Sequence, residues 1–546
     1  MQEASFRIVN PYVFVYYSFD LGEEFDRKKL FSGRRAIEQC LISWEWEGHT
    51  GEEGVLSKIK DFDERFFTPS YFHFGRFCRL QFKPIKVTKT IIRNFPECNF
   101  KIGDIDVIAT IYDVGVGVIC FCFPILTNSE GLSVDEIITI QRDITGEREK
   151  IVFSALIDRK ICECFSRTAD PIELKEHVIE MEKIPETLTD ALETFGEILY
   201  LKWERGLEAY YKEKEREGEI KLSLIRRLKE SKSNMIAIEK LNFYLLFKMI
   251  RNFLIEKFRD KKYRDWRELI SDLRDTTVSI DIQLLITHTE PDIFSNLDAL
   301  TENPSYRKII YGLVSRDPNW RLTRADKVFE LISPDVSSRD DIRNFVGFDS
   351  SIIFYKSHDK QIKDVSSLPD RILRRLCIYN IVKTTRYILD FFNRMIDSPK
   401  LKPKKPRDIA IFRDFVRKHV TYYYTFSFMD ESSFLMPYRE ILDECKKQMR
   451  LEEAYKSVSD KLDQMDRKIS IIYSEAAEKA LLLLNIIISG TIAFAIIDKL
   501  ATPAFGQYIA AWLYIPAWIA TAVCLYYITQ MIKKKLIEEF PEEVIS

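Results

Sequence analysis

Residues 480–497 read ALLLLNIIISGTIAFAII, and residues 508–532 read YIAAWLYIPAWIATAVCLYYITQMI. Neither stretch holds a charged side chain, and residues 498–507, with Pro503 and Gly506, separate them. The hydrocarbon core of a bilayer needs about 20 apolar residues per helix, within a range of about 17–25. The two stretches therefore predict two membrane-spanning helices joined by a short turn. A pair of buried helices in a soluble protein is the alternative.

The residues that flank the two stretches predict their orientation. Lys533, Lys534 and Lys535 follow the second stretch, and the connecting segment holds a single cation, Lys499. Positive side chains collect on the cytosolic side of a membrane, so we expect both termini in the cytosol and a multi-pass protein of the inner membrane. Aromatic side chains suited to the headgroup region are Trp512, Tyr514, Trp518, Tyr526 and Tyr527. Residues 1–10 are too polar for a secretory signal.

The rest of the chain has the composition of a soluble protein. Of 546 residues, 46% are hydrophobic and 30% charged, and the net charge of −2 gives no argument for nucleic-acid binding. The cysteine pairs Cys120/Cys122 and Cys162/Cys164 lack the two-residue gap of a zinc knuckle. These cysteines are therefore interpreted as structural thiols in a reducing compartment, with metal ligation as the alternative.

The predicted fold class is an α+β cytosolic domain with a large helical part, a long stalk helix and two C-terminal transmembrane helices. Residues 1–165 form the N-terminal α/β domain. Within it, residues 6–19, 105–112 and 116–123 are rich in residues that favour strands, and Asp113-Val114-Gly115 predicts a hairpin turn. A helix is expected from Ser133, with Glu136 completing a capping box.

The middle of the chain divides by composition. Residues 166–397 predict a mainly helical cytosolic region, with helices at 188–227 and 378–396. Residues 398–436 form a basic, proline-rich linker followed by a strand at 421–428. The linker is interpreted as exposed chain, with contact to anionic headgroups as the alternative. Residues 437–479 are the stalk helix, and residues 480–532 hold the two spans.

The stalk carries an apolar residue at alternating intervals of four and three. Because this is a heptad seam, we predict one helix from Pro437 to Ile497 that self-associates along the seam, with packing against another segment of the same chain as the alternative. The seam comprises Leu451, Tyr455, Val458, Leu462, Met465, Ile469, Ile472 and Ala476.

Polar residues interrupt the first predicted span. Asn485 and Ser489 lie four residues apart on one helical face, and Glu478 continues the same stripe. Polar side chains in a bilayer are costly unless they face a partner or water. The stripe therefore predicts a pore lining, with hydrogen bonding to a neighbouring helix as the alternative. The pore-lining candidates are Glu478, Asn485, Ser489 and Thr491, and Asp498 is expected at the outer mouth, or paired with Lys499.

This layout resembles the CorA family of membrane cation channels. The shared features are a large cytosolic domain, a stalk helix that continues into the first span, a short outer loop, a second span and a basic tail. The resemblance covers residues 451–536 in architecture and residues 1–450 loosely. It implies a homopentamer that conducts divalent cations. The family carries Gly-Met-Asn after its first span, but residues 497–503 here read IDKLATP, so magnesium selectivity is not implied.

The enlarged cytosolic part also resembles a divergent CorA branch that is associated with type III CRISPR systems. That resemblance implies an antiviral channel opened by an adenylate second messenger, S-adenosylmethionine joined to AMP, and it assigns no ligand-binding residues. A divalent metal transporter (Mg, Co, Ni or Zn) is one alternative, and a membrane-anchored, non-conducting sensor or enzyme is another. The chain holds no Walker A loop, G-x-G-x-x-G, H-E-x-x-H or nucleophile elbow, so we predict no enzymatic activity. A divalent cation and an adenylate nucleotide are the candidate ligands.

Overall fold

The protein forms two compact units. One comprises residues 1–401 and 418–458, and the other comprises residues 402–417 and 459–546. The computed structural model describes residues 6–21, 27–46, 49–51, 77–92, 100–112, 115–145, 151–167, 215–258, 279–337, 339–357, 362, 364–397, 413–414, 416–418, 420, 436–496, 498–499, 503, 515–521, 523 and 526–527. The predicted linker at 398–407 and the predicted strand at 421–428 lie outside the described residues.

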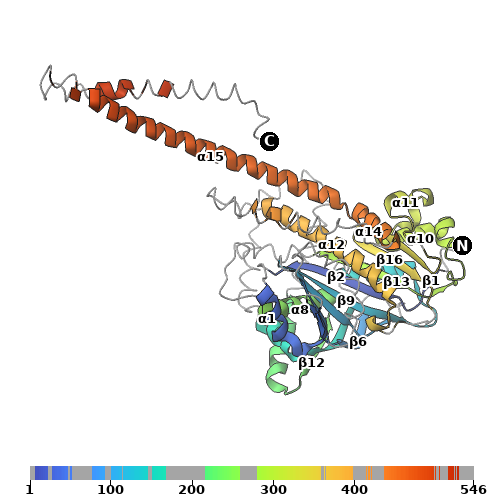
Figure 1. Cartoon of the computed structure of the whole chain (residues 1–546). Coiled ribbons are helices and arrows are strands. Elements are labelled where there is room, and N and C mark those ends of the chain that lie inside the picture. The colour runs from blue at the N-terminus through green and yellow to red at the C-terminus, as the bar shows by residue number, and fades with distance from the viewer. Residues whose placement is uncertain are drawn as a thin grey trace, which may run out of the picture. The chain divides into compact units, whose positions relative to one another are not determined.

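A ten-stranded sheet organises the first unit (Figure 1). Its main path runs β15-β16-β13-β2-β9-β8-β5-β3-β4, and β7 pairs with β9. Neighbours on this path are antiparallel except β13 and β16, which are parallel. The strands are β2 (Tyr12–Asp20), β3 (Leu41–Trp46), β4 (His49–Gly51), β5 (Phe77–Phe82), β7 (Phe100–Ile102), β8 (Asp106–Tyr112), β9 (Val116–Thr127), β13 (Ser279–Ile286), β15 (Ile342–Val346) and β16 (Ser350–Tyr355).

Two three-stranded sheets accompany the main sheet. One has the order β10-β1-β14 and joins β1 (Arg7–Ile8) to β10 (Leu132–Ser133) and β14 (Thr289–Glu290). The other has the order β12-β11-β6 and joins β11 (Ile151–Asp158) to β12 (Met235–Leu241) and β6 (Lys86–Ile92). Residues far apart in the sequence are therefore held together by strand pairing throughout this unit.

Two local predictions for the N-terminal part are confirmed and one is corrected, whereas residues 113 and 114 of the predicted turn lie outside the described residues. Strands β8 and β9 form the expected antiparallel hairpin, and Gly115 takes the positive φ of 80° that a tight turn requires. Helix α3 (Val134–Ile144) begins after Ser133, and Ser133 and Glu136 form the reciprocal capping box. The predicted strand at 6–19 is divided into β1 and β2, and between them Asn10 has a φ of 46°.

Helices cover both faces of the main sheet. Tyr17 of β2 stacks on Phe247 of α8 (Phe243–Phe258) at 4.7 Å between ring centroids, whereas Tyr16 contacts Tyr379 of α12 (Asp370–Asp397). Adjacent side chains of a strand point to opposite faces, so α8 and α12 lie on opposite sides of the sheet (Figure 1). The other helices of this unit include α1 (Arg27–Ile37), α4 (Arg159–Arg167), α9 (Ala299–Glu302), α10 (Pro304–Ser315), α11 (Val328–Leu331) and α14 (Met436–Gln448).

The predicted domain boundary near residue 165 is wrong. Strands β12, β13, β15 and β16 all lie between residues 235 and 355, so the region predicted to be mainly helical supplies strands to the same sheets as the N-terminal part. Residues 350–355 of β16 read SSIIFY, and burial on both faces removes the apolar–polar alternation by which a half-exposed strand is recognised. The predicted helix at 378–396 is confirmed as part of α12.

The predicted single helix from Pro437 to Ile497 is also wrong. The chain forms α14 and then α15 (Leu451–Ile496, 46 residues), and Arg450 between them has a φ of 49°. This left-handed conformation ends α14. Glycine usually occupies such a position, so an arginine there gave no sequence signal for the break. Helix α15 includes residues of both units.

Candidate functional site

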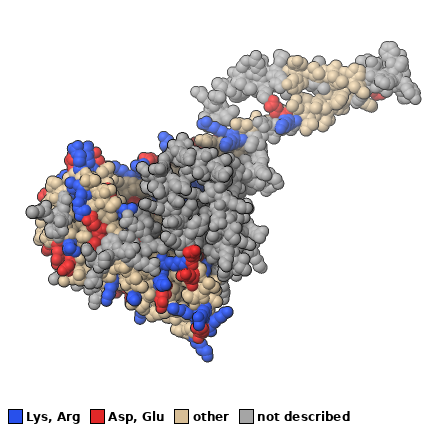
Figure 2. All heavy atoms as spheres, turned by 180° about the vertical axis from the view of Figure 1, so that it is seen from behind, with Lys and Arg blue, Asp and Glu red and all other residues tan. Residues whose placement is uncertain are grey.

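The end of α15 has the length and composition of a membrane span. Residues Ala477–Ile496 form this candidate span, and their most apolar 18-residue window has a mean hydropathy of 2.0 and is only 12% buried inside the protein. Leu483 and Ile487 are 63% and 66% exposed. Charged side chains of both signs intermix over the first unit, whereas the described atoms of this end are mostly uncharged (Figure 2). A soluble core helix would bury these side chains, so this exposed surface fits the first predicted span.

One such helix is found among the described residues, so two spans are not confirmed. Of the second predicted span, the structure describes residues 515–521, 523 and 526–527, which are helical. These residues pack on α15 within the second unit. The Trp518 indole Nε1–H donates to the Ile486 carbonyl at 3.1 Å, and the Thr521 hydroxyl donates to the Ser489 carbonyl at 3.3 Å. Gly490 makes room for the indole, because a Cβ there would lie 3.0 Å from Nε1.

This packing places the predicted pore-lining residues in different surroundings. Ser489 is fully buried within the single chain, and its hydroxyl donates to the Ile486 carbonyl at 2.8 Å. Thr491 is exposed on another face and donates to the Ile487 carbonyl. Glu478 and Asn485 are half-buried. Ser489 therefore lies in a helix–helix contact, although its hydroxyl bonds within its own helix and only its carbonyl accepts from the neighbouring segment. The pore lining and the alternative of a side-chain hydrogen bond to a neighbouring helix both stay predictions. Asp498, the predicted outer-mouth residue, is exposed.

The heptad seam is covered mainly within one chain. Leu451, Val458, Leu462 and Ile469 are at most 6% exposed, whereas Tyr455 and Met465 are half-buried. The side chains of Ile472 and Ala476 lie outside the described residues. Four seam positions therefore fit packing against the same chain, and self-association through α15 would use its other faces.

The face of the sheet beneath α12 is polar, although it is buried. The Tyr16 hydroxyl donates to Gln283 at 2.6 Å, and the Gln283 amide donates to Ser351 at 2.6 Å. Lys383 of α12 pairs with Asp281 of β13 at 2.5 Å, and both side chains are at most 6% exposed. Helix α12 is held on the sheet by the Lys383–Asp281 ion pair and by a hydrogen bond from Arg371 Nη2 to the Tyr355 hydroxyl of β16 at 2.7 Å, as well as by apolar contact. Such bonds define one position of the helix more sharply than apolar packing alone.

The second half of α12 contacts the start of α15. Arg386 donates from Nη1 to the carbonyls of Met449 and Arg450, at 3.1 and 2.7 Å. Further along, the Ser457 hydroxyl of α15 donates to Asn393 of α12 at 3.1 Å. Both contacts lie within the first unit. Helix α12 therefore connects the sheet to the segment from which the candidate membrane helix departs.

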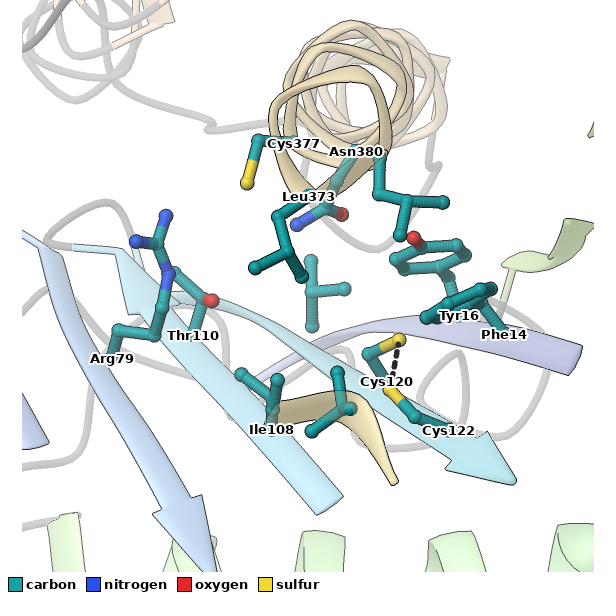
Figure 3. Close-up of a pocket in the computed structure, with 13 residues that line it drawn as sticks. Phe14, Tyr16, Arg79, Ile108, Thr110, Cys120, Cys122, Leu373, Cys377 and Asn380 are labelled. Carbon is teal, nitrogen blue, oxygen red and sulfur yellow. Dashed lines mark hydrogen bonds between the residues drawn. The ribbon is translucent and has the colours of Figure 1, made fainter. Parts of the chain in front are cut away.

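A cavity of about 50 Å³ lies between α12 and the polar face of the sheet (Figure 3). The Arg79 guanidinium and the Asn380 amide point into this space, and the Asn380 Oδ1 atom has no hydrogen-bond partner among the described residues. A buried water needs roughly 10–15 Å³ by this measure, so the space suits a few waters rather than a nucleotide. It is lined by Phe14, Tyr16, Arg79, Ile108, Thr110, Val118, Cys120, Cys122, Val365, Leu373, Leu376, Cys377 and Asn380.

The thiols at this cavity do not form a recognisable metal site. The Sγ atoms of Cys120 and Cys122 lie 3.5 Å apart. Burial raises the pKa of the Cys122 thiol well above its usual range. A protonated thiol is a poor metal ligand and a poor nucleophile. Within the described parts of the chain, no group of three His, Cys, Asp or Glu side chains has a geometry that could hold a metal ion.

Comparison of the chain with protein-family models, with curated proteins and with solved structures finds no match. The resemblance to the CorA layout therefore stays a prediction.

Sequence reasoning did not identify α12 as a functional element. It predicted the helix at 378–396 from its amphipathic pattern, and that pattern does not show which cations are buried. Lys383 and Arg386 stand among apolar residues in the sequence, and this was the available signal. Their roles depend on Asp281 and Arg450, which are distant in the sequence.

Proposed function

We propose that this protein is an oligomeric membrane channel of CorA-like layout, whose soluble unit controls its membrane end. The observation that carries the proposal is α15. Its final 20 residues are mostly apolar and mostly exposed, whereas its first residues belong to the unit that is built on the sheet. Burying these side chains in a bilayer removes their apolar surface from water, which supplies the free energy of insertion.

Control by the soluble unit is supported by the contacts of α12. This helix is tied to the sheet through Lys383 and Asp281, and to the start of α15 through Arg386 and Asn393. A ligand that shifts α12 on the sheet would therefore change the position from which α15 departs. Moving such an equilibrium from 1:99 to 99:1 requires about 5.5 kcal/mol of differential binding, or about 1 kcal/mol at each of five identical sites.

Assembly of several copies, five in the CorA layout, is supported by the apolar faces of α15 that remain exposed after the intrachain packing. Leu483, Ile487 and Phe494 lie on this surface, and each is more than half exposed. In such an assembly Asn485 and Thr491 are the candidates to face water, because Ser489 is already covered by its own chain. The permeating species would be a cation, attracted by Asp498 at the outer mouth.

Ion flux across liposomes tests the proposal. The purified full-length protein is reconstituted with an ion-sensitive dye inside and titrated with Mg²⁺ and with adenylate compounds, including S-adenosylmethionine joined to AMP. We expect flux that appears with an adenylate ligand and changes in an Asn485→Leu variant, whereas Lys229→Met on the first unit leaves the flux unchanged. No flux under any condition would contradict conduction.

The alternative is a divalent metal transporter of the same layout. It is distinguished by a constant divalent flux that is indifferent to nucleotides. The third function, a membrane-anchored sensor or enzyme that does not conduct, predicts membrane attachment without any flux.

A further inference from the structure

Helix α12 buries an arginine for which the described part of the chain supplies no ion pair. Arg375 is 2% exposed, and its Nε and Nη1 atoms have no hydrogen-bond partner among the described residues. Burial lowers the pKa of this guanidinium, although nearby acids act in the opposite direction. An uncompensated buried cation costs several kcal/mol, so a native structure that retains one requires an explanation.

The nearest acids are already engaged with other arginines. Asp335 pairs with Arg343 at 3.3 Å, and Asp341 pairs with Arg371 at 2.5 Å. The Arg375 guanidinium faces the ring of Tyr438 on α14, whose centroid lies 6.0 Å from the guanidinium carbon. This distance is at the outer limit of a cation–π contact, so the ring is a weak substitute for a carboxylate.

Further unsatisfied groups lie close to Arg375 on α12. Tyr379, one turn later on the same face, is 1% exposed, and its hydroxyl has no partner among the residues that the structure describes. The same holds for Nε of Arg374. Most of these groups are donors. A ligand with several acceptor oxygens and a negative charge would satisfy these donors. The planar guanidinium of arginine matches the spacing of phosphate oxygens and can bind two of them at once.

We propose that the interface between α12 and α14 is a binding site for an oxyanion of the phosphate class, with Arg375 as its central ligand and Tyr438 as its cover. Because the Tyr438 ring lies over the guanidinium, an anion reaches it only when α14 moves away from α12. Helix α14 is followed directly by α15, so occupancy would displace the start of the candidate membrane helix. The site stands on its own geometry, whereas this last consequence rests on the proposed function.

Binding of inorganic pyrophosphate to the full-length protein in a neutral detergent tests the site. Calorimetry and thermal unfolding are measured at constant ionic strength, with Arg375→Met as the test variant and Arg439→Met, a half-exposed arginine of α14, as the control. We expect pyrophosphate to raise the unfolding temperature of the wild type and of the control, and Arg375→Met to weaken binding at least about tenfold. Without anion, Arg375→Met should be at least as stable as the wild type, because it removes an uncompensated buried charge.

A second variant and a lipid experiment complete the test. Tyr379→Phe deletes the unpaired hydroxyl alone and should fold normally while binding pyrophosphate more weakly. Nanodiscs containing phosphatidylglycerol, without free anion, show whether a lipid headgroup supplies the oxyanion: stabilisation of the wild type there, lost in Arg375→Met, assigns the site to lipid. An equal response to pyrophosphate in wild type and Arg375→Met would overturn the proposal, as would a wild type that responds to neither source. Binding is measured without flux, so failure here leaves the channel proposal standing.

Discussion

The Arg386 guanidinium donates to the main-chain carbonyl of Arg450 over 2.7 Å, at the residue where the chain turns from α14 into α15. The same nitrogen also donates to the Met449 carbonyl. The Met449 carbonyl lies beyond the end of α14, where carbonyls lack partners within the helix, and the α12 side chain satisfies it. The Arg450 carbonyl also accepts from the Ala454 N–H of α15 at 3.2 Å. The direction in which α15 departs is thereby tied to α12.

Replacing Arg386 by Met should loosen this junction. The variant loses hydrogen bonds from a charged donor, and the expected cost in unfolding free energy is about 1.5–3 kcal/mol. Hydrogen exchange of the full-length protein should show faster exchange over residues 445–455 and unchanged exchange in β2 and β9. Arg226→Met, which removes an 82% exposed arginine side chain, is the matched control. Unchanged exchange at the junction would contradict the role of Arg386.

The contact between Gly490 and Trp518 should tolerate little added volume. In Gly490→Leu the added Cβ lies 3.0 Å from the Trp518 Nε1 atom, and the rest of the side chain meets the indole ring. Residues 515–521 must therefore move away from α15. We expect Gly490→Leu to have a lower unfolding temperature in detergent. A chemical crosslink placed between α15 and residues 515–521 should form in the wild type and be lost in this variant. Ala495→Leu adds the same side chain at an exposed position of α15 and should have little effect. Equal behaviour of the two variants would show that the contact is unimportant.

Lys383 should be needed to bury Asp281. Replacing Lys383 by Met leaves a carboxyl that is 1% exposed without its cation, at an expected cost of about 3–5 kcal/mol. The double variant Asp281→Leu/Lys383→Met removes both charges and should recover most of the loss. Thermal unfolding followed by circular dichroism compares the three proteins. A double variant as unstable as the single one would show that the packing of Lys383, not its charge, matters.

The same pair predicts a pH dependence. Burial raises the pKa of Asp281 above 3.8, against the lowering effect of Lys383. The folded protein then holds the proton at pH values where the unfolded chain has released it. Stability therefore decreases as the pH rises from about 3.8 through the raised pKa. In Lys383→Met the opposing effect is absent, so the decrease should be larger and extend to higher pH. A profile identical to that of the wild type would contradict this assignment.

The elements predicted best from sequence were those with local signals. The hairpin before and after Gly115 and the capping box at Ser133 depend on residues within a few positions of each other, and both are confirmed. The apolar stretch at 480–497 is likewise read from composition. The domain division failed because β16 is buried on both faces and shows no alternation, whereas the alternation at residues 280–284 of β13 was a signal that the prediction missed.

The contacts of the candidate site depend on tertiary structure. Nothing in the sequence around Arg375 shows that Asp335 and Asp341 are occupied by other arginines, or that Tyr438 will cover the guanidinium. The break at Arg450 was equally hidden, because the side chain that donates to its carbonyl from α12, Arg386, is 64 residues away. The polar stripe illustrates the same limit: a helical wheel places Asn485 and Ser489 on one face but does not show which neighbour that face meets.

Insertion of α15 in a membrane is the central claim, and topology labelling tests it most directly. A Thr502→Cys variant, at a position outside the described residues, is probed on intact cells with a membrane-impermeant maleimide, and Lys229→Cys in the first unit is the cytosolic control. We predict that the protein stays in the membrane fraction after alkaline extraction, that residue 502 reacts from outside, and that residue 229 reacts only after lysis. Release by alkali, or labelling of residue 502 only from the inside, would contradict the account.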